Sequence, residues 1–183
     1  MSELAEIGVP SRVGVMGGGR MGARIAHAFQ LAGAYVTVVE RDVPSAEAAR
    51  IRIEESLDAS IARGVATDAA LLKQALTVAT NVGAFGACQL VVEAVPEILD
   101  LKLETLRAIE QQLPDFAILA SNTSSIPLEQ LAQILDRPSQ FIGLHFFNPV
   151  PASNLIEIVV HDQADAALPE KVRGWVAALG KTP

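Results

Sequence analysis

A glycine-rich turn limits what this chain can fold into more than any other feature. Residues 13–16 are apolar or small, and glycines follow in the spacing Gly-x-Gly-x-x-Gly, at Gly17, Gly19 and Gly22. In a strand–turn–helix unit, the first glycine permits the tight turn, the second leaves room for a pyrophosphate, and the third lets the helix approach the strand closely. The free amides at the start of the helix hold the phosphates. The turn predicts a dinucleotide site, although an ordinary turn between a strand and a helix is the alternative. The residues expected to contact the nucleotide here are Gly17, Gly18, Gly19, Arg20, Met21 and Gly22.

The residues after this turn extend the pattern. Apolar residues from Ile25 to Ala32 recur at helical spacing, and Gly33 is suited to end the helix. Residues 35–39 predict a buried strand, and Glu40 follows it at about the spacing of 20 residues at which an acid meets the adenosine ribose. Glu40 favours NAD over NADP, since a carboxylate repels a 2′-phosphate. Arg41 weakens this inference, because a neighbouring arginine can accommodate that phosphate.

Predicted strands alternate with predicted helices along the rest of the chain. The alternation predicts an α/β fold, a Rossmann-type doubly wound and mostly parallel sheet that ends in an antiparallel hairpin. Ser45, directly after Pro44, is the expected N-cap of the second long helix. After a first strand–helix–strand unit at 12–40, strands are expected at 76–80, 90–95, 116–120, 141–147 and 155–160, and helices at 45–63, 68–75, 99–113, 127–135 and 166–179.

Composition excludes several classes of protein. The chain has 183 residues, half of them apolar and 19% charged, which suits one domain with a sizeable core. A formal net charge of −7 argues against nucleic acid as a main partner. No apolar run reaches the length of a membrane span, residues 1–10 do not resemble a secretory signal, and no group of residues has the spacing of a metal site. The single cysteine, Cys88, excludes an internal disulfide and indicates a reducing compartment, which we take to be the cytoplasm.

Of the three histidines, His145 has the strongest claim to a chemical role. His27 falls inside a predicted helix and His161 in a polar loop, where structural or solvated imidazoles are common. His145 lies near the end of a predicted strand, at the edge where open α/β sheets bind their ligands.

A hairpin between the last two strands predicts a partner for His145. If they pair symmetrically about Pro151, Phe147 faces Leu155 and His145 faces Glu157. Glu157 interrupts an apolar strand, so we expect a buried carboxylate that needs a partner. A carboxylate behind an imidazole fixes its tautomer and raises its basicity, so that it can take the proton of an alcohol while hydride leaves for nicotinamide. A purely structural ion pair is the alternative.

Two neutral polar residues lie in predicted loops at the same edge. Ser124 and Asn148 could hold substrate oxygens, or serve only as a turn residue and an N-cap.

Two segments together resemble one family of enzymes. The segment Gly-Leu-His145-Phe-Phe-Asn148-Pro-Val-Pro151, preceded by Ser121-Asn-Thr-Ser-Ser125, is similar to the L-3-hydroxyacyl-CoA dehydrogenase family. The resemblance covers nearly all of residues 12–183, as the NAD-binding domain of that family. It implies NAD-dependent interconversion of an L-3-hydroxyacyl-CoA and a 3-ketoacyl-CoA, in fatty acid metabolism.

The resemblance also implies roles for individual residues. His145 would be the catalytic base and Glu157 its partner, with Ser124 near substrate and nicotinamide and Asn148 beside the catalytic pocket. Further NAD contacts would come from Glu40, Glu97 and Lys102, and coenzyme A contacts from Ser56, Arg63 and Ser124. Arg63 stands where the family usually has lysine, which keeps the charge but changes its geometry.

The chain departs from the family at its end. Family members continue into an all-helical domain that closes the acyl pocket and forms a homodimer. We therefore expect residues 1–183 to be the NAD-binding domain alone, with a turn at 180–183 that leads toward a further strand. Other interpretations are a dehydrogenase that acts on a carrier-protein-bound or free hydroxy acid, and a nucleotide-binding module without activity.

Overall fold

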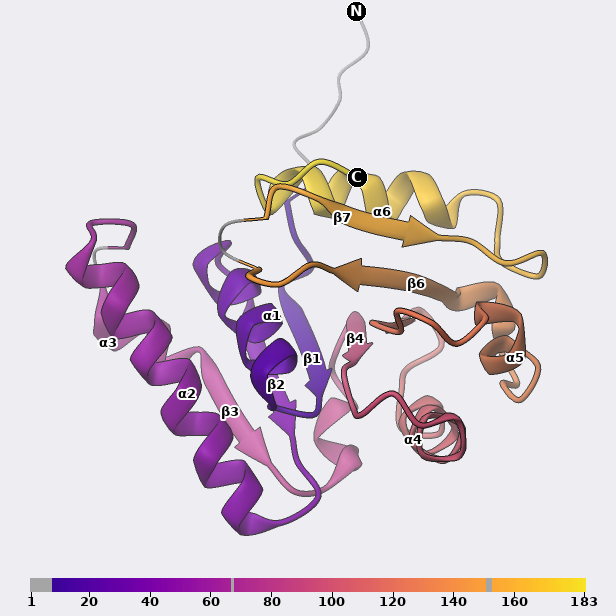
Figure 1. Ribbon diagram of the computed structural model, residues 1–183, viewed down its shortest axis with the longest axis horizontal. Coiled ribbons are helices and arrows are strands. Elements are labelled where there is room, and N and C mark those ends of the chain that lie inside the picture. Colours follow the sequence, from indigo (N-terminus) through magenta and orange to yellow (C-terminus); the bar gives the residue numbers. More distant parts are fainter. Residues whose placement is uncertain (1–7, 67, 151–152) are drawn as a thin grey trace, which may run out of the picture.

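A seven-stranded sheet forms the centre of the computed structural model, which describes residues 8–66, 68–150 and 153–183 (Figure 1). Its spatial order is β3-β2-β1-β4-β5-β6-β7, so the chain reverses its direction of travel across the sheet between β1 and β4. Neighbours from β3 to β6 are parallel, and β7 is antiparallel to β6. This confirms the predicted doubly wound fold and its final hairpin. The strands are β1 (Arg12–Met16), β2 (Tyr35–Val39), β3 (Leu76–Ala79), β4 (Leu90–Glu93), β5 (Ile118–Ser121), β6 (Phe141–Phe146) and β7 (Ile156–Val159).

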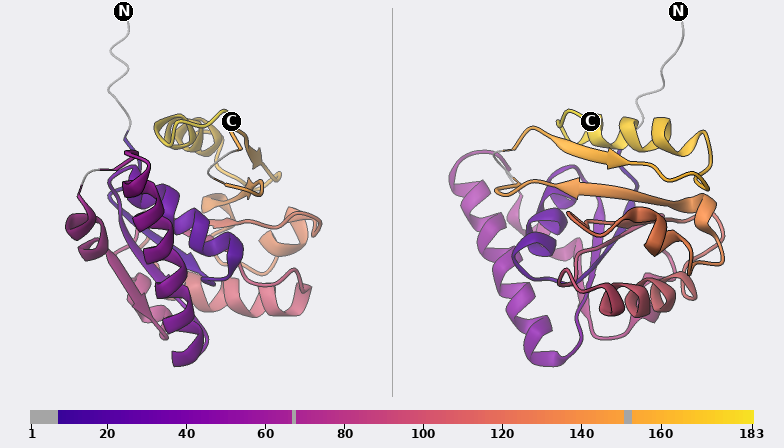
Figure 2. Two further views of the ribbon diagram at one scale, coloured as in Figure 1. Left: turned by 60° about the vertical axis from the view of Figure 1, so that its left-hand side comes forward. Right: turned by 45° about the vertical axis from the view of Figure 1, so that its right-hand side comes forward.

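Helices cover both faces of the sheet (Figure 2). One apolar cluster joins the sheet to α1 (Arg20–Leu31), α2 (Val43–Ala62) and α6 (Leu168–Ala178). A second cluster on the opposite face joins it to α4 (Leu99–Glu110), α5 (Leu128–Ala132) and the 3-10 helix η1 (Val82–Phe85). Short connections contain α3 (Ala69–Gln74) and a second 3-10 helix, η2 (Pro138–Gln140). Because both faces are covered, the central strands are apolar at nearly every position.

Successive residues of each strand point to opposite faces, and this fixes which side chains share the site. In β4, Leu90 and Val92 pack in the cluster of α1, whereas Val91 packs in the cluster of α4. Glu93 therefore points toward the α4 face. By the same alternation, Ser121 at the end of β5 and His145 in β6 point to that face.

The start of α2 differs from our prediction. Ser45 is not the N-cap: the helix begins at Val43, and the Asp42 carboxylate accepts a hydrogen bond from the Ser45 backbone N at 2.7 Å. Asp42 precedes Pro44 by two residues and places the proline in the first turn, where its missing N–H costs nothing. The signal was visible in the sequence, since aspartate is as good an N-cap as serine.

The predicted register of the last hairpin is confirmed, although the strands are shorter than expected. His145 pairs with Glu157, and the ladder ends where Phe146 pairs with Ile156. Leu155 does not face Phe147 within this ladder; it forms a parallel bridge with Thr182 instead. Pro151, about which we centred the hairpin, lies outside the described residues, as do residues 1–7.

Candidate active site

The glycine turn has the shape that a pyrophosphate needs. Gly17 has a φ of +91°, a conformation that side chains disfavour. A Cβ on Gly22 would lie 1.7 Å from the Gly17 carbonyl O, so α1 could not approach β1 as it does. A Cβ on Gly19, in contrast, would meet no atom within 4 Å. The space beside Gly19 and the free amides of the first turn of α1 therefore fit the phosphates of a dinucleotide.

Glu40 lies at the end of β2, directly against this turn. Its Oε1 accepts a hydrogen bond from the Gly18 backbone N at 2.6 Å, and Arg52 of α2 donates to the Gly18 carbonyl O at 3.3 Å. The Arg41 guanidinium is exposed and pairs with Asp42 at 3.0 Å. The acid that we expected near the adenosine ribose thus sits beside the glycine turn, with its arginine neighbour held by a different carboxylate.

His145 and Glu157 form the predicted pair. His145 Nδ1 lies 3.0 Å from Glu157 Oε2, and the Phe147 ring packs 4.4 Å from the imidazole, centroid to centroid. Our expectation that Glu157 is buried was wrong, because its side chain is 56% exposed. The reason is position: β7 is the last strand of the sheet, and Glu157 points away from the face that α6 covers.

A contact between α1 and the β6–β7 connection brings the nucleotide-binding helix to the edge that carries His145. Arg24, one turn into α1, donates a hydrogen bond to the Asn148 side-chain O. This contact ties Asn148 to α1, and none of the described helices has Asn148 as its N-cap. Its place beside the catalytic pocket stays a prediction. Sequence analysis did not predict Arg24, since an arginine on a surface helix has no signal of its own.

Glu97 organises the loop that carries Ser124. Its Oε1 accepts hydrogen bonds from Thr123 Oγ1 at 2.6 Å and from the Ser124 and Ser125 backbone N atoms, each at 2.9 Å. Partial burial opposes ionisation, but hydrogen bonds from Thr123, Ser125 and Ser124 and the charge of Lys102 outweigh it and lower the pKa of Glu97 to about 2. Glu97 is therefore an anion at any ordinary pH.

Lys102 contacts Glu97, but its ammonium points inward. Its side chain is 1% exposed, and Nζ lies 2.7 Å from Glu93 Oε1 and 3.2 Å from Glu97 Oε2. Sequence analysis missed Glu93, although an acid within the apolar run at 90–95 was a visible signal of the same kind as Glu157.

Ser56 lies on α2, and Arg63 is the C-cap residue at the end of that helix. They are seven positions apart, about two helical turns, and so share a face of the helix. Ser56 Oγ bonds the Arg52 carbonyl O at 2.8 Å, and Arg63 reaches Ser60 Oγ at 3.5 Å. Ser60 also bonds His27 Nε2 at 3.0 Å, which ties α2 to α1. Burial, and then the Arg63 charge, lower the pKa of His27, so this imidazole is a neutral packing group.

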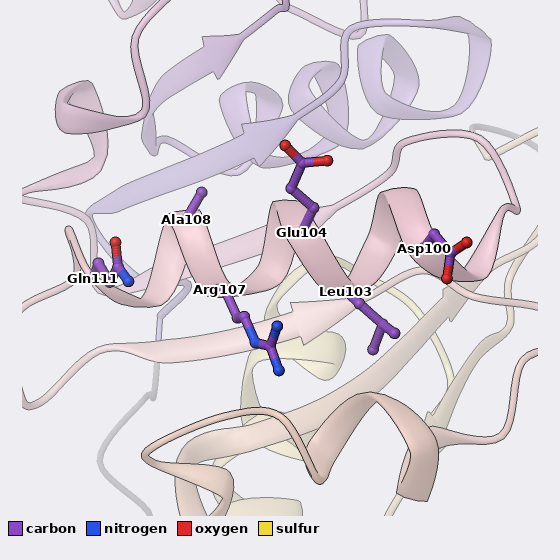
Figure 3. Close-up of a pocket in the computed structure, with 6 residues that line it drawn as sticks. All are labelled: Asp100, Leu103, Glu104, Arg107, Ala108 and Gln111. Atoms are coloured by element: carbon purple, nitrogen blue, oxygen red, sulfur yellow. The ribbon is translucent and has the colours of Figure 1, made fainter.

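A hollow of 430 Å³ runs along α4, but its geometry does not suit catalysis. All its lining side chains come from one helix, and they spread along its surface instead of converging on a point (Figure 3). Binding sites instead gather polar groups from several elements. The lining residues are Asp100, Leu103, Glu104, Arg107, Ala108 and Gln111.

Comparison with known proteins shows the family of the chain. Residues 12–183 match the family model described as 3-hydroxyacyl-CoA dehydrogenase, NAD binding domain. The chain belongs to this family. NAD is accordingly the cofactor of the domain, and the residues around Gly19 fit it.

Members of the 3-hydroxyacyl-CoA dehydrogenase family are similar over most of this chain. It is 42% identical to a 3-hydroxybutyryl-CoA dehydrogenase of Mycobacterium tuberculosis, over 93% of this chain and 61% of that protein. The crystal structure of (S)-3-hydroxybutyryl-CoA dehydrogenase from Ralstonia eutropha superposes with a TM-score of 0.90 at 34% identity, covering 95% of this chain and 62% of that one. A diketoreductase structure also gives a TM-score of 0.90, at 28% identity, covering 96% of this chain and 63% of that one. The chain thus spans about three fifths of the length of these relatives. Among the residues that the structure describes, no helix is long and apolar enough to cross a membrane.

Proposed function

We propose that this chain is the cofactor-binding part of an NAD-dependent L-3-hydroxyacyl-CoA dehydrogenase, in which His145 is the base. The observation that carries the proposal is the 3.0 Å contact between His145 Nδ1 and Glu157 Oε2, at the edge where Arg24 joins α1 to Asn148. The 3-hydroxybutyryl-CoA dehydrogenases among its relatives support the reaction class.

The pair has the groups that an alcohol oxidation requires. With Nδ1–H donating to Glu157, His145 Nε2 is left unprotonated and can accept the hydroxyl proton of the substrate. Loss of that proton lets the C–O bond become a carbonyl as the C–H electron pair departs. NAD, when bound, supplies the nicotinamide ring that accepts this hydride. The positive charge formed on His145 is stabilised by Glu157, and the reverse reaction returns the same proton to the carbonyl oxygen.

Further residues have proposed positions around the acyl thioester. Ser124 and Asn148 are neutral hydrogen-bonding groups suited to hold the substrate oxygen. Ser56 and Arg63 would meet the coenzyme A moiety along α2, where the arginine offers a charge to a phosphate. Glu40, Glu97 and Lys102 would support NAD, Glu40 near the adenosine and the other two through the Ser124 loop. A helical domain that follows, closes the acyl site and forms a homodimer is part of the proposal. Its support is that two relatives extend beyond the matched 61% and 62% of their length. The lone Cys88 supports a cytoplasmic location.

A second function remains open because of one relative. The diketoreductase shares the fold and is described as acting on dicarbonyl compounds. A substrate without coenzyme A, free or on a carrier protein, would not need Arg63. Replacing Arg63 with alanine should therefore raise the KM only for coenzyme A thioesters, and an unchanged KM would favour the second function.

The decisive experiment replaces His145 with glutamine in a polypeptide that continues through the helical domain. NADH oxidation by acetoacetyl-CoA should fall by about a thousandfold or more, because general base catalysis alone contributes 10²–10⁴. NADH affinity, followed by nucleotide fluorescence, should stay within about twofold, because His145 touches the substrate and not the phosphates. Turnover that survives the replacement would show that the base is a different residue. If the protein were instead a nucleotide-binding module without activity, the unaltered polypeptide would already show no turnover.

A further inference from the structure

Glu93 is a buried acid that the proposed reaction does not use. It is the last residue of β4, its side chain is fully buried, and both carboxylate oxygens have partners. Oε1 accepts from Lys102 Nζ at 2.7 Å and from the Val95 backbone N at 2.8 Å, and Oε2 accepts from Ser121 Oγ at 2.6 Å. Burying a carboxylate costs free energy, and the cost is offset only when its oxygens have partners. The partners of Glu93 lie at the edge of the sheet that carries the candidate site, so we ask what their arrangement does there.

Two routes lead from Glu93 to the Ser124 loop. Along the first, Lys102 Nζ bridges Glu93 and Glu97, and Glu97 accepts the backbone N–H groups of Ser124 and Ser125. Along the second, Ser121 Oγ donates a hydrogen bond to Glu93 Oε2 and accepts one from the Thr123 backbone N at 3.2 Å. Both routes end in residues 121–126, so the position of this loop depends on one carboxylate beneath it.

The backbone next to Glu93 also reaches the strand of His145. The Glu93 carbonyl O accepts the Asn122 backbone N–H at 2.8 Å, and Asn122 Oδ1 accepts the Phe146 backbone N–H at 2.8 Å. Across the sheet, Glu93 pairs with Ser121, and Ser121 with Gly143. His145 is the next residue of β6 on that same face.

The topology assigns this network to one half of the cofactor. Doubly wound sheets bind a dinucleotide across the point where the strand order reverses, one mononucleotide on each half. Here β1, β2 and β3 carry the glycine turn and Glu40, which leaves β4, β5 and β6 for the nicotinamide half. Glu93, Ser121 and Asn122 all lie at the ends of strands in that second half.

We propose that Glu93 is a positioning residue for the nicotinamide half of NAD, acting through Lys102 and Ser121 on Glu97 and the Ser124 loop. The inference rests on the proposed function, because it presupposes that NAD binds at this edge. Glu93 touches no ligand in this scheme. It keeps the Lys102 ammonium turned inward and fixes the position of the Ser124 loop relative to the ends of the strands.

The experiment compares two ligands on the chain as it stands. NADH carries both halves of the cofactor, and ADP-ribose lacks only the nicotinamide. Glu93→Gln should weaken NADH by about tenfold, the factor that corresponds to one hydrogen bond to a charged group, and leave ADP-ribose within about twofold. Both constants are measured by calorimetric titration, on protein whose folding is checked by circular dichroism.

Two further variants keep the test decisive. Glu110→Gln is the matched control, because Glu110 is also a buried acid but accepts the Asp136 and Arg137 backbone N–H groups near the start of β6. It should change neither affinity. Ser121→Ala removes one hydroxyl without altering a charge, and should shift NADH alone, by less than Glu93→Gln does. If Glu93→Gln does not fold, Ser121→Ala alone tests whether the network positions the nicotinamide half.

The outcomes separate the inference from the function on which it rests. Selective loss of NADH affinity in Glu93→Gln or Ser121→Ala supports a positioning role. Equal loss of both ligands, or no loss of either, overturns it and leaves Glu93 a packing group, while the proposed function stands. An unaltered chain that binds neither ligand overturns both.

Discussion

At the scale of single residues, two glycines of the same turn serve different purposes. A Cβ at Gly22 would collide with the Gly17 carbonyl O at 1.7 Å, whereas a Cβ at Gly19 would stand in open space. Gly22→Ala should therefore destabilise the fold by about 3 kcal/mol, the range of an overpacked core. Gly19→Ala should leave the melting temperature unchanged or slightly higher, because the Gly19 φ of −63° suits alanine. Its methyl group would occupy the space of the pyrophosphate, so NADH affinity should fall by about tenfold or more.

Thermal unfolding and NADH titration of the two variants check this pair of expectations. Each variant is the control for the other, because both add one methyl group to the same turn. Normal NADH binding by a stable Gly19→Ala protein would show that the phosphates lie elsewhere.

The sequence was sufficient for those residues whose role follows from spacing. The glycine motif and the register that opposes His145 to Glu157 follow from chain-local rules. Burial does not, because it depends on what the neighbouring elements cover. Glu157 is exposed on the last strand of the sheet, and Lys102 is buried with its ammonium against Glu93 and Glu97. The bonds from Glu97 to the Ser124 loop join residues far apart in the sequence, where spacing has no predictive value.

At the scale of elements, the start of α2 provides a direct test of our corrected N-cap. Hydrogen bonds from Ser45, first its side chain and then its backbone N, lower the pKa of Asp42, so the ionised form stabilises the folded state. Asp42→Ala should lower the melting temperature at pH 7, and Ser45→Ala should lower it less. The stabilisation from Asp42 is complete above its ordinary pKa of 3.8 and is lost as the pH falls through the lowered value. The difference between Asp42→Ala and the unaltered chain should therefore disappear in acid.

Calorimetric scans from neutral pH to below the lowered pKa of Asp42 measure this difference. A larger loss for Ser45→Ala than for Asp42→Ala would restore our first assignment of the cap.

Element types were predicted better than their ends: strands and helices fell where alternation placed them, but β5 begins at Ile118 because Phe116 is exposed. Such ends depend on capping and burial more than on periodicity.

At the scale of the whole molecule, the order of the strands explains why the candidate site is gathered at one edge. Because β1, β4 and β5 are parallel, the glycine turn and the ends of β4 and β5 lie on the carboxyl side of one sheet. The reversal of strand order between β1 and β4 is the point at which such sheets bind ligands. The antiparallel β7 then adds Glu157 beside His145, and Arg24 reaches across from α1. Sequence alternation predicted this architecture, because parallel strands joined by helices allow few other topologies.

The same arrangement leaves part of the His145–Glu157 pair open to water, and this leads to our prediction for the chain as a whole. The side chains of His145 and Glu157 are 19% and 56% exposed.

Hydride transfer requires the alcohol carbon to be held against the nicotinamide with water excluded, and effective positioning contributes several orders of magnitude to the rate. The Phe147 ring packs against His145, but within residues 8–66, 68–150 and 153–183 both side chains keep exposed surface. About two fifths of the length of the first relative lies outside the match. We therefore expect the 183-residue chain to bind NADH but to reduce acetoacetyl-CoA about a hundredfold more slowly than a polypeptide that includes the proposed helical domain. Steady-state rates at saturating NADH compare the two proteins, with His145→Gln in each as the background. Equal rates would mean that the two side chains need no cover, and that the site is complete on this sheet.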